Sequence, residues 1–443
     1  MNYRFLLSVL VSTIGVYLFT YSYLEDAVVD HTILLVLSLH IFLFYFFSIF
    51  ISRRNMFSPK GIFVFVFLFS ILFVGLFNYL FFIDTGSFFE FTESDSTLYH
   101  EFATITLNYG FFEGIQNFMI FSRFDYDDAG MIAYLSIFYR VIEHPLFVRF
   151  VNVIIHASTV CLIYKISRCY LKENTSALVS LIYGMSSFAI YYVSSGMKET
   201  VFTFLVVLSF YNYSLYKNNG GNLALFKAFI FSAMILFFRI PVALFLFLSF
   251  AIVEFWFNKI SITKTLVVFL SVSTLIVLVV SNYSLLEHYL SLGNPNENAV
   301  SSLSPGFSFK LLVVIAGFFG PFPTFIPVDG YKDDSIWAAT LILKVFLSIY
   351  FIFGVFFAYK WKHSYMTVLV LFCLLNIFGL VLVDNTFKVR YILPYIPLFL
   401  IVVGYAYDVM TFSANSYAVE RKLILPINLI LLVVMFYWNI LRL

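Results

Sequence analysis

The stretch FTESDSTLYHEFA, residues 91–103, holds side chains well suited to chemistry. In a chain of which only 11% is charged, it gathers Glu93, Asp95, His100 and Glu101. Tyr99 follows Asp95 by one helical turn. Held at a membrane surface, a carboxylate such as Asp95 acts as a general base toward a hydroxyl or holds a divalent cation; the alternative is a solvated loop acid.

Four basic residues have positions that suit phosphate binding: Lys198, Arg239, Lys388 and Arg390. Lys198 precedes Glu199 at a helix junction, where the paired ammonium binds a phosphate or anchors the helix. Arg239, in FFRIPV, interrupts a long apolar run and needs a partner there. Its guanidinium suits a lipid-linked phosphate, and the alternative is an extended side chain that reaches the headgroups.

Other ionisable residues have less specific patterns. His100 assists Asp95, binds a metal or is an ordinary polar residue. Asp125, Asp127 and Asp128 in FDYDDAG have the density of a cation site, but their spacing matches no complete EF-hand loop. We interpret them as a solvated turn. The sequence leaves the metal unknown and predicts no cofactor beyond a divalent cation.

The composition predicts a membrane protein. The chain has 443 residues, is 62% hydrophobic and contains 60 Phe and 31 Tyr, which is unusual for a soluble domain. Apolar runs of about 20 residues recur, each enough to cross a bilayer core. They leave no room for a soluble domain, so we expect one transmembrane domain over residues 1–443. The bilayer is a predicted partner, and the net charge of +2 does not favour nucleic acid.

We expect an all-α polytopic integral membrane protein with about 13 transmembrane helices. The short connections on one side carry most of the Lys and Arg, which predicts a cytoplasmic N-terminus. The predicted spans are 5–24, 33–52, 62–83, 146–165, 177–194, 200–215, 222–238, 240–257, 264–281, 337–358, 364–383, 394–412 and 423–441.

Two outer segments are long enough to carry a site. In the large first outer loop, 84–145, apolar positions predict amphipathic helices along the membrane face: Leu98, Phe102, Ile105 and Leu107, then Ile132, Leu135, Phe138 and Val141. The second segment, 282–336, contains a stretch rich in Gly and Pro, 310–330, that we interpret as re-entrant or interfacial.

The run ESDSTLYHEFATITLNYG resembles the first outer loop of the GT-C superfamily of glycosyltransferases, of the protein mannosyltransferase and aminoarabinose transferase type. In that family an acid before a helix that ends in Gly is catalytic. The matching residue is Asp95, with Glu93 as the near neighbour. The family often has Asp-Glu at this point, whereas Ser96 follows Asp95 here.

Two further stretches extend the resemblance to residues 84–215 and 385–407. Arg149 matches an Arg that opens the next span. KVRYILPYIPLFLIVVGYAY resembles a late outer stretch of the family and carries Arg390 and Tyr391. Site neighbours on this basis are Tyr99, His100, Arg149 and Tyr391.

The resemblance implies an inverting glycosyltransferase with a polyprenyl-phosphate or polyprenyl-diphosphate sugar donor. Its acceptor would be a saccharide or a lipid-linked acceptor on the periplasmic side of a bacterial inner membrane, in O-antigen or capsule synthesis. Asp95 would take the acceptor proton, while Lys198, Arg239 and Arg390 would hold the leaving phosphate.

Two other functions stay open. A repeat-unit polymerase of the same polysaccharide pathway also has about a dozen spans and functional arginines. A transporter of lipid-linked sugars predicts charges near mid-membrane and two related halves, and neither is clear in the sequence.

Overall fold

A computed structural model describes the chain over residues 58–91, 95–121, 127–257, 333–383, 389–412 and 423–440, with Phe46, residues 318–320 and residue 322. Within these ranges the fold is helical and contains no β-strand, as predicted. The elements are α3 (Pro59–Thr85), α4 (Asp95–Tyr109), α5 (Phe111–Phe121), α6 (Ala129–Tyr139), α7 (Pro145–Arg168), α8 (Glu173–Gly184), α9 (Ser187–Ser195), α10 (Glu199–Asn219), α11 (Asn222–Met234), η1 (Ile235–Phe237), α12 (Ile240–Phe257), α16 (Asp333–Lys360), α17 (Ser364–Val383), η2 (Val389–Ile392), α18 (Ile396–Phe412) and α20 (Leu425–Ile440).

Three of these helices are long and apolar enough to cross a membrane: α3, α7 and α16 from Ile336 to Lys360. A fourth candidate is α8 with α9, which replaces the predicted straight span by a pair bent by 45°. Shorter apolar helices stand at the other predicted spans from residue 222 to 257 and beyond residue 364. The predicted spans 5–24 and 264–281, and 33–52 apart from Phe46, lie outside the described residues. The number thirteen therefore stays a prediction.

Local signals in the sequence fix where the long helices begin and end. The Ser58 hydroxyl accepts a hydrogen bond from the backbone of Gly61, and Pro59 opens α3 at a position where no intrahelical N–H is needed. At the other end of α3, Gly86 takes the left-handed conformation that commonly closes a helix. His144 and Pro145 open α7 in the same manner.

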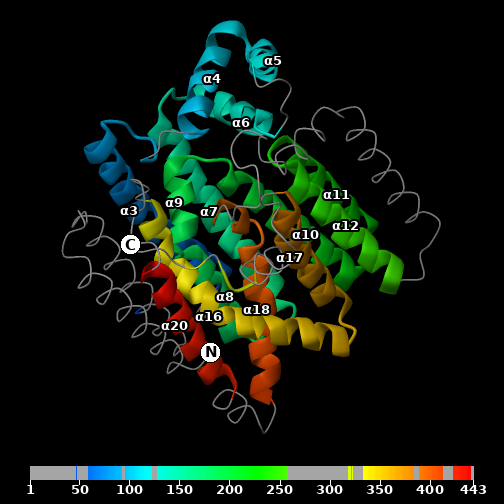
Figure 1. The fold of residues 1–443 in the computed structure, drawn as a ribbon. Helices are drawn as coiled ribbons and strands as arrows, with labels where there is room; N and C mark the ends of the chain where they lie inside the picture. Colours follow the sequence, from blue (N-terminus) through cyan, green and yellow to red (C-terminus); the bar gives the residue numbers. More distant parts are fainter. Residues whose placement is uncertain are drawn as a thin grey trace, which may run out of the picture.

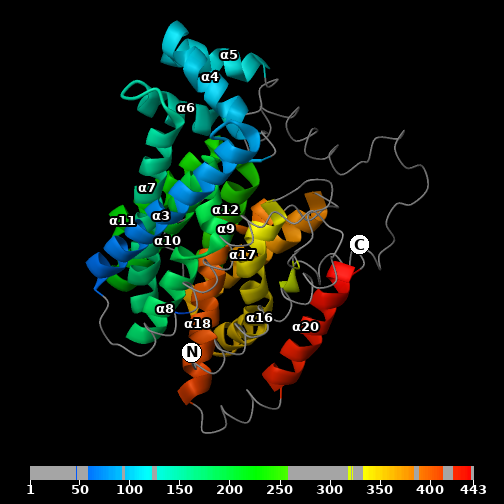
Figure 2. The ribbon, with the colours of Figure 1, turned by 90° about the vertical axis from the view of Figure 1, so that its left-hand side faces the viewer.

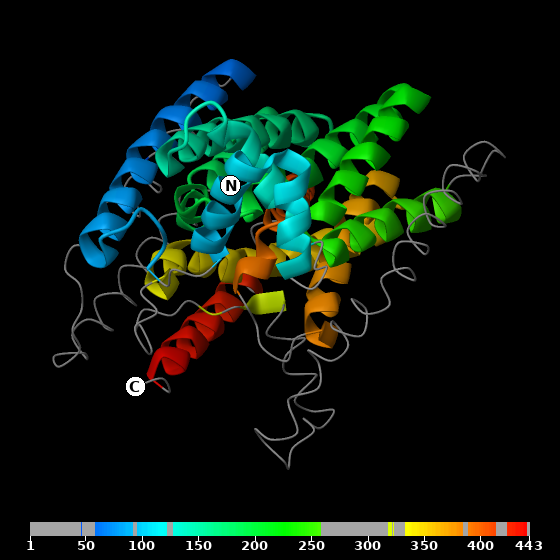
Figure 3. The same ribbon diagram turned by 90° about the horizontal axis from the view of Figure 1, so that it is seen from above.

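Helices α4, α5 and α6 form a cap over one end of the helix bundle (Figure 1, Figure 2). Below this cap, α3 packs against α7 and α9, α10 packs against α7 and α11, and α16 packs against α18 and α9. Seen from above, α3 lies on one side of the bundle and α11 with α12 on the other (Figure 3). We call the end that carries the cap the cap end, and the opposite end, where α7 ends at Arg168, the distal end.

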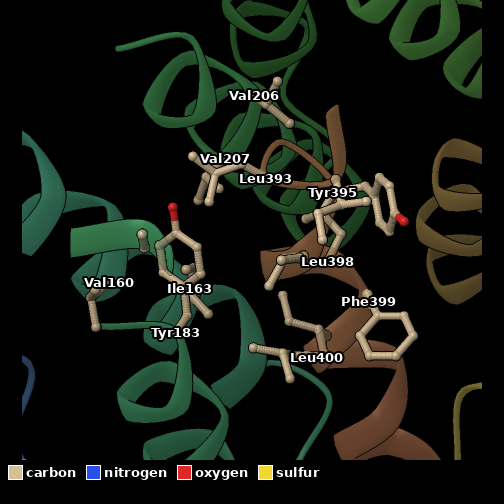
Figure 4. Close-up of a cluster of buried hydrophobic side chains, with 14 of the residues drawn as sticks. Val160, Ile163, Tyr183, Val206, Val207, Leu393, Tyr395, Leu398, Phe399 and Leu400 are labelled. Carbon is tan, nitrogen blue, oxygen red and sulfur yellow. The ribbon is translucent and has the colours of Figure 1, made fainter. Parts of the chain in front are cut away.

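The core of the bundle joins early and late parts of the chain. Val160, Ile163 and Tyr183 from α7 and α8 are buried near Val206 and Val207 of α10, and Leu393 to Leu400 approach the same space from the start of α18 (Figure 4). Elsewhere the surface is apolar: on α3, Leu68 is 61% exposed and Tyr79 is 60% exposed. Such side chains are compatible with contact to a lipid bilayer.

The cap differs from the predicted amphipathic pattern. Its three helices occur within the loop 84–145, but the buried face of α4 consists of Ser96, Tyr99, Ala103 and Thr106. The predicted Leu98, Phe102 and Ile105 are only half-buried. Polar packing explains the difference, because the Thr106 hydroxyl donates to the Ser136 hydroxyl of α6 at 2.6 Å. Of the apolar positions predicted for the second helix, Ile132 and Leu135 are buried, Phe138 is half-buried and Val141 is exposed.

Candidate functional site

The predicted base and one predicted phosphate-binding cation meet at the cap end. Asp95 is the first residue of α4, and its carboxylate pairs with the guanidinium of Arg390 in η2. The Asp95 side chain is 37% exposed and that of Arg390 is 26% exposed. The pair is thus open enough for a ligand to reach.

A second ion pair lies deeper in the same region. The Lys198 ammonium, whose side chain is only 6% exposed, pairs with the carboxylate of Asp128 and also donates to the backbone oxygen of Asp127 at 3.2 Å. The Tyr99 hydroxyl donates to the same Asp128 carboxylate at 2.7 Å. Since Asp95 and Tyr99 are one turn apart on α4, this helix links the two ion pairs.

Arg239 has the partner that its place in an apolar run requires. Its Nη1 lies 3.6 Å from Oε1 of Glu199, the residue after Lys198, and the Glu199 side chain is only 2% exposed. The Asp127 carboxylate holds the neighbouring segment, because it accepts from the backbone N–H of Ile240 at 2.7 Å. Lys198 therefore pairs with Asp128 rather than with the adjacent Glu199.

A glycine permits the close approach of the cap to this corner. A Cβ on Gly130 would lie 2.7 Å from the backbone oxygen of Phe237 and 2.9 Å from the ring of Phe238. Any larger residue at this position would push α6 away from the segment that carries Arg239. Asp128 and Asp127, just before α6, can then reach Lys198 and Ile240 respectively.

A group of buried polar residues positions the elements that carry these charges. The Glu90 carboxylate accepts hydrogen bonds from the backbone and hydroxyl of Ser96, and so caps the N-terminus of α4 beside Asp95. Arg149 donates from Nε to the backbone oxygen of Ser194 at 2.5 Å and from Nη2 to that of Ser195 at 2.8 Å. It thereby holds the C-terminus of α9, just before Lys198.

His100 belongs to this positioning group rather than to the two ion pairs. Its Nδ1 lies 2.8 Å from the hydroxyl of Tyr139, and its ring packs against Phe89. Burial, and next the charge of Arg149, lower the pKa of His100 below its usual value of 6.5. We therefore expect a neutral imidazole at pH 7.

Electrostatics favour a charged Asp128 and a neutral Tyr99. Burial alone would raise the pKa of Asp128, but the charge and hydrogen bond of Lys198, with the hydrogen bond of Tyr99, hold this pKa below its usual value. Burial raises the pKa of Tyr99 well above 10.0, and the carboxylates of Asp128 and Asp95 raise it further. The Tyr99 phenol is thus a fixed donor to Asp128.

The structure thus brings together Asp95, Tyr99, Lys198, Arg239 and Arg390, which the sequence singled out. Glu93 and Lys388 lie outside the described residues. Tyr391 lies in η2 next to Arg390, and nothing further of its side chain is described. No group of three or more His, Cys, Asp or Glu side chains that could hold a metal ion occurs among the described residues, and the predicted cation stays a prediction.

Sequence reasoning misread two acids and missed a third. Asp127 is 4% exposed and the Asp128 side chain 25% exposed, so the interpretation of these residues as a solvated turn is wrong; Asp125 lies outside the described residues. Glu90, which is fully buried, was not singled out at all. Lys198 needed a counter-ion, and this was the signal that could have found Asp128. Asp127 and Glu90 accept from the backbone N–H groups of Ile240 and Ser96, and the local sequence does not reveal these contacts.

No protein-family model, curated protein or solved structure matches the chain. The chemistry of the site must therefore be argued from its geometry. The partly exposed Asp95 carboxylate lies in the same region as three cations. Each cation is paired with an acid: Arg390 with Asp95, Lys198 with Asp128, and Arg239 with Glu199. Such a site can accept a proton at its surface and stabilise negative charge behind it.

Proposed function

We propose that the chain is an inverting membrane glycosyltransferase whose sugar donor is linked to a polyprenyl phosphate or diphosphate. It would act at the periplasmic face of a bacterial inner membrane, in the synthesis of a surface polysaccharide. The observation that carries the proposal is the ion pair between Asp95 and Arg390. It places the predicted base next to a cation that the family resemblance assigns to the phosphate.

The proposed reaction is a single displacement. The Asp95 carboxylate accepts the proton of an acceptor hydroxyl while the hydroxyl oxygen forms a bond to the anomeric carbon of the sugar. The bond from that carbon to the phosphate oxygen breaks, and its electron pair leaves with the phosphate. Arg390, the partner of Asp95, would stabilise the charge that develops on this oxygen.

The ion pair also gives a reason for ordered binding. While Arg390 holds the Asp95 carboxylate, the base is engaged. A donor phosphate competes for the same guanidinium, because arginine binds phosphate and carboxylate through the same planar set of donors. Donor binding would then release Asp95 for the acceptor, so that the base acts only when a sugar is present.

Lys198 and Arg239 would contribute through their charge, without direct contact to the donor. Both are largely buried and each has a carboxylate partner, so neither is open to bulk phosphate. Their charges still act over a short distance in a site with little water. We assign them to the field that favours an anionic donor, and Arg390 to direct contact.

The test is the surface polysaccharide of cells that lack the chromosomal gene and carry wild type, Asp95→Asn or Arg390→Ala at matched protein levels. Glu101→Gln is the matched control, because Glu101 is an exposed acid on the same helix α4. We expect Asp95→Asn to give the deletion phenotype, and Glu101→Gln to give wild-type chains on a gel. Wild-type chains from Asp95→Asn would contradict the proposed base.

The same gel distinguishes a transferase that adds one sugar from a repeat-unit polymerase. Loss of long chains with a single complete repeat unit still attached would indicate a repeat-unit polymerase. A shortened, incomplete unit would indicate a transferase that adds one sugar.

Transport of lipid-linked sugars is a second candidate, and Lys344 is the observation in its favour. Lys344 is 4% exposed and lies within α16, one of the helices long enough to span a membrane. Its ammonium donates to the backbone oxygens of Phe318, at 3.2 Å, and Gly320. If Lys344→Met leaves lipid-linked sugar on the cytoplasmic face of membrane vesicles while Asp95→Asn does not, transport is the better reading.

A further inference from the structure

An open groove runs between α3 and α7 on the flank of the bundle. Its volume is about 340 Å³, and most of its lining is apolar, including Ile71, Tyr79 and Phe150. On α3 the lining extends from Ile71 to Phe82, which corresponds to about 16 Å of helix. Both helices are long and apolar enough to cross a membrane. The groove is therefore compatible with contact to lipid.

Two polar side chains, Asn78 and Arg149, line the same groove. The Asn78 amide donates to the backbone oxygens of Val74 at 2.8 Å and Ser194 at 3.4 Å. Arg149 also donates to the oxygen of Ser194. The two side chains thus converge on one carbonyl at the end of α9, and they lie next to each other.

This junction leaves one acceptor and one donor without a hydrogen bond to any described residue, although the Arg149 guanidinium also lies over the ring of Phe89. Both amide hydrogens of Asn78 go to carbonyl oxygens, which fixes the orientation of the amide and leaves its Oδ1 without a donor. The Nε and Nη2 atoms of Arg149 are engaged with α9, and its Nη1 is left. Asn78 is only 4% exposed, so an unsatisfied oxygen there is costly.

A ligand that completes this junction needs three features. It needs an alkyl chain for the apolar lining, an acceptor for Arg149 Nη1 and a hydrogen-bond donor for Asn78 Oδ1. We propose that the groove binds a glycerophospholipid whose headgroup carries a donor, with one acyl chain along α3 and the phosphate on Arg149. Phosphatidylglycerol supplies a hydroxyl and phosphatidylethanolamine an ammonium, whereas the choline headgroup has no N–H or O–H.

The groove is separate from the proposed donor site. Its lining belongs to α3, α7 and Phe88, whereas Lys198, Arg239 and Arg390 precede α10, α12 and α18. Figure 1 and Figure 3 place α3 across the bundle from α11 and α12. The proposal therefore does not depend on glycosyl transfer, and a measurement of lipid binding alone can test it.

Gly75 offers a variant that tests the groove without touching the polar junction. It lines the groove, and a Cβ at this position would meet nothing within 4 Å. Gly75→Phe should fill the groove and leave α3 intact. Val64→Phe is the matched control, because Val64 is 53% exposed on the same helix and does not line the groove.

The experiment is native mass spectrometry of the purified full-length protein with equal amounts of phosphatidylglycerol, phosphatidylethanolamine and phosphatidylcholine. We expect one retained lipid, and a preference of about tenfold for either donor-bearing headgroup over choline, the size of one satisfied buried hydrogen bond. Gly75→Phe should lose the retained lipid and Val64→Phe should keep it. Asn78→Leu should bind all three lipids equally, since it removes the acceptor but not the groove.

Several results would overturn the proposal. Equal retention in Gly75→Phe and wild type would show that lipid binds elsewhere, and equal loss in Val64→Phe would show non-specific lipid. A lack of headgroup preference in wild type would remove the role of Asn78. Displacement of the lipid by equimolar polyprenyl phosphate would assign the groove to an isoprenoid lipid instead.

Discussion

The two ends of the bundle both bury charge, but they arrange it differently. At the distal end, Lys217 and Glu254 pair at 2.5 Å, and the Tyr213 hydroxyl donates to the same carboxylate at 2.7 Å. Asp408 accepts from the backbone of Lys172 at 2.7 Å. These acids each tie one helix to its neighbour. Helix packing and capping account for them fully.

At the cap end, the charges come from separate elements and meet. Asp95 stands on α4, Asp128 before α6, Lys198 before α10 and Arg390 in η2. One helix packed on its neighbour needs no such convergence. The difference indicates that a buried ion pair alone does not mark a site, whereas several pairs shared among elements beside an exposed carboxylate do.

The largest expected effect comes from loss of Lys198. In Lys198→Met the Asp128 carboxylate loses its ammonium, and the cation field behind Asp95 weakens. We expect sugar transfer to fall by about 100- to 1,000-fold, as for removal of one group that stabilises the transition state. Lys217→Met is the distal control and should keep transfer near wild type at matched amounts of folded protein. Equal losses in both variants would erase the contrast between the two ends.

Glu254→Gln should show the reverse pattern. It leaves Lys217, whose side chain is only 12% exposed, without its carboxylate at the distal end. We expect a loss of about 2–3 kcal/mol of stability, since one partner of a largely buried pair is removed. Thermal unfolding of the purified protein should show the loss, while transfer per folded molecule stays unchanged. A large loss of sugar transfer per folded molecule would show that the pair of Lys217 and Glu254 also contributes to function.

The coupling between Asp95 and Arg390 should be smaller. A double-mutant cycle with Asp95→Asn and Arg390→Met measures it from the unfolding free energies of the four proteins. We expect about 0.5–1 kcal/mol, because both side chains are partly exposed. A coupling of zero, in the absence of donor, would contradict the contact.

The smallest expected effect is a pH dependence of the cap through His100. Its pKa lies below 6.5 in the folded protein, so the unfolded chain binds the proton more readily. The stability that His100 contributes is therefore fully present above pH 6.5, and it is lost as the pH falls below that value toward the folded pKa. His100→Gln should reduce the change of the melting temperature with pH between pH 6.5 and 5. An unchanged slope in this variant would place the titrating group elsewhere.

The sequence predicted much of the helix placement and less of the site. The apolar run placed a span at 62–83, and α3 covers Pro59–Thr85. Ser58 with Pro59, and Gly86, are the local signals that set its ends, and the prediction did not use them. The need of Arg239 for a partner also followed from hydrophobicity alone. The identity of that partner did not, because Glu199 meets Arg239 only through tertiary packing. Asp127 and Asp128 read as solvent-facing for the same reason: composition shows a cluster of acids, but not the cations folded onto it.

The contact between Asp95 and Arg390 joins positions 295 residues apart in the sequence, and this sets an order for biogenesis. At a synthesis rate of about 5–20 residues per second, Arg390 leaves the ribosome about 15–60 s after Asp95. During that interval α4 is already outside the ribosome, but its first residue has no guanidinium beside it. A nascent chain arrested before η2 would therefore lack the contact between Asp95 and Arg390, although Lys198 would already be present to pair with Asp128.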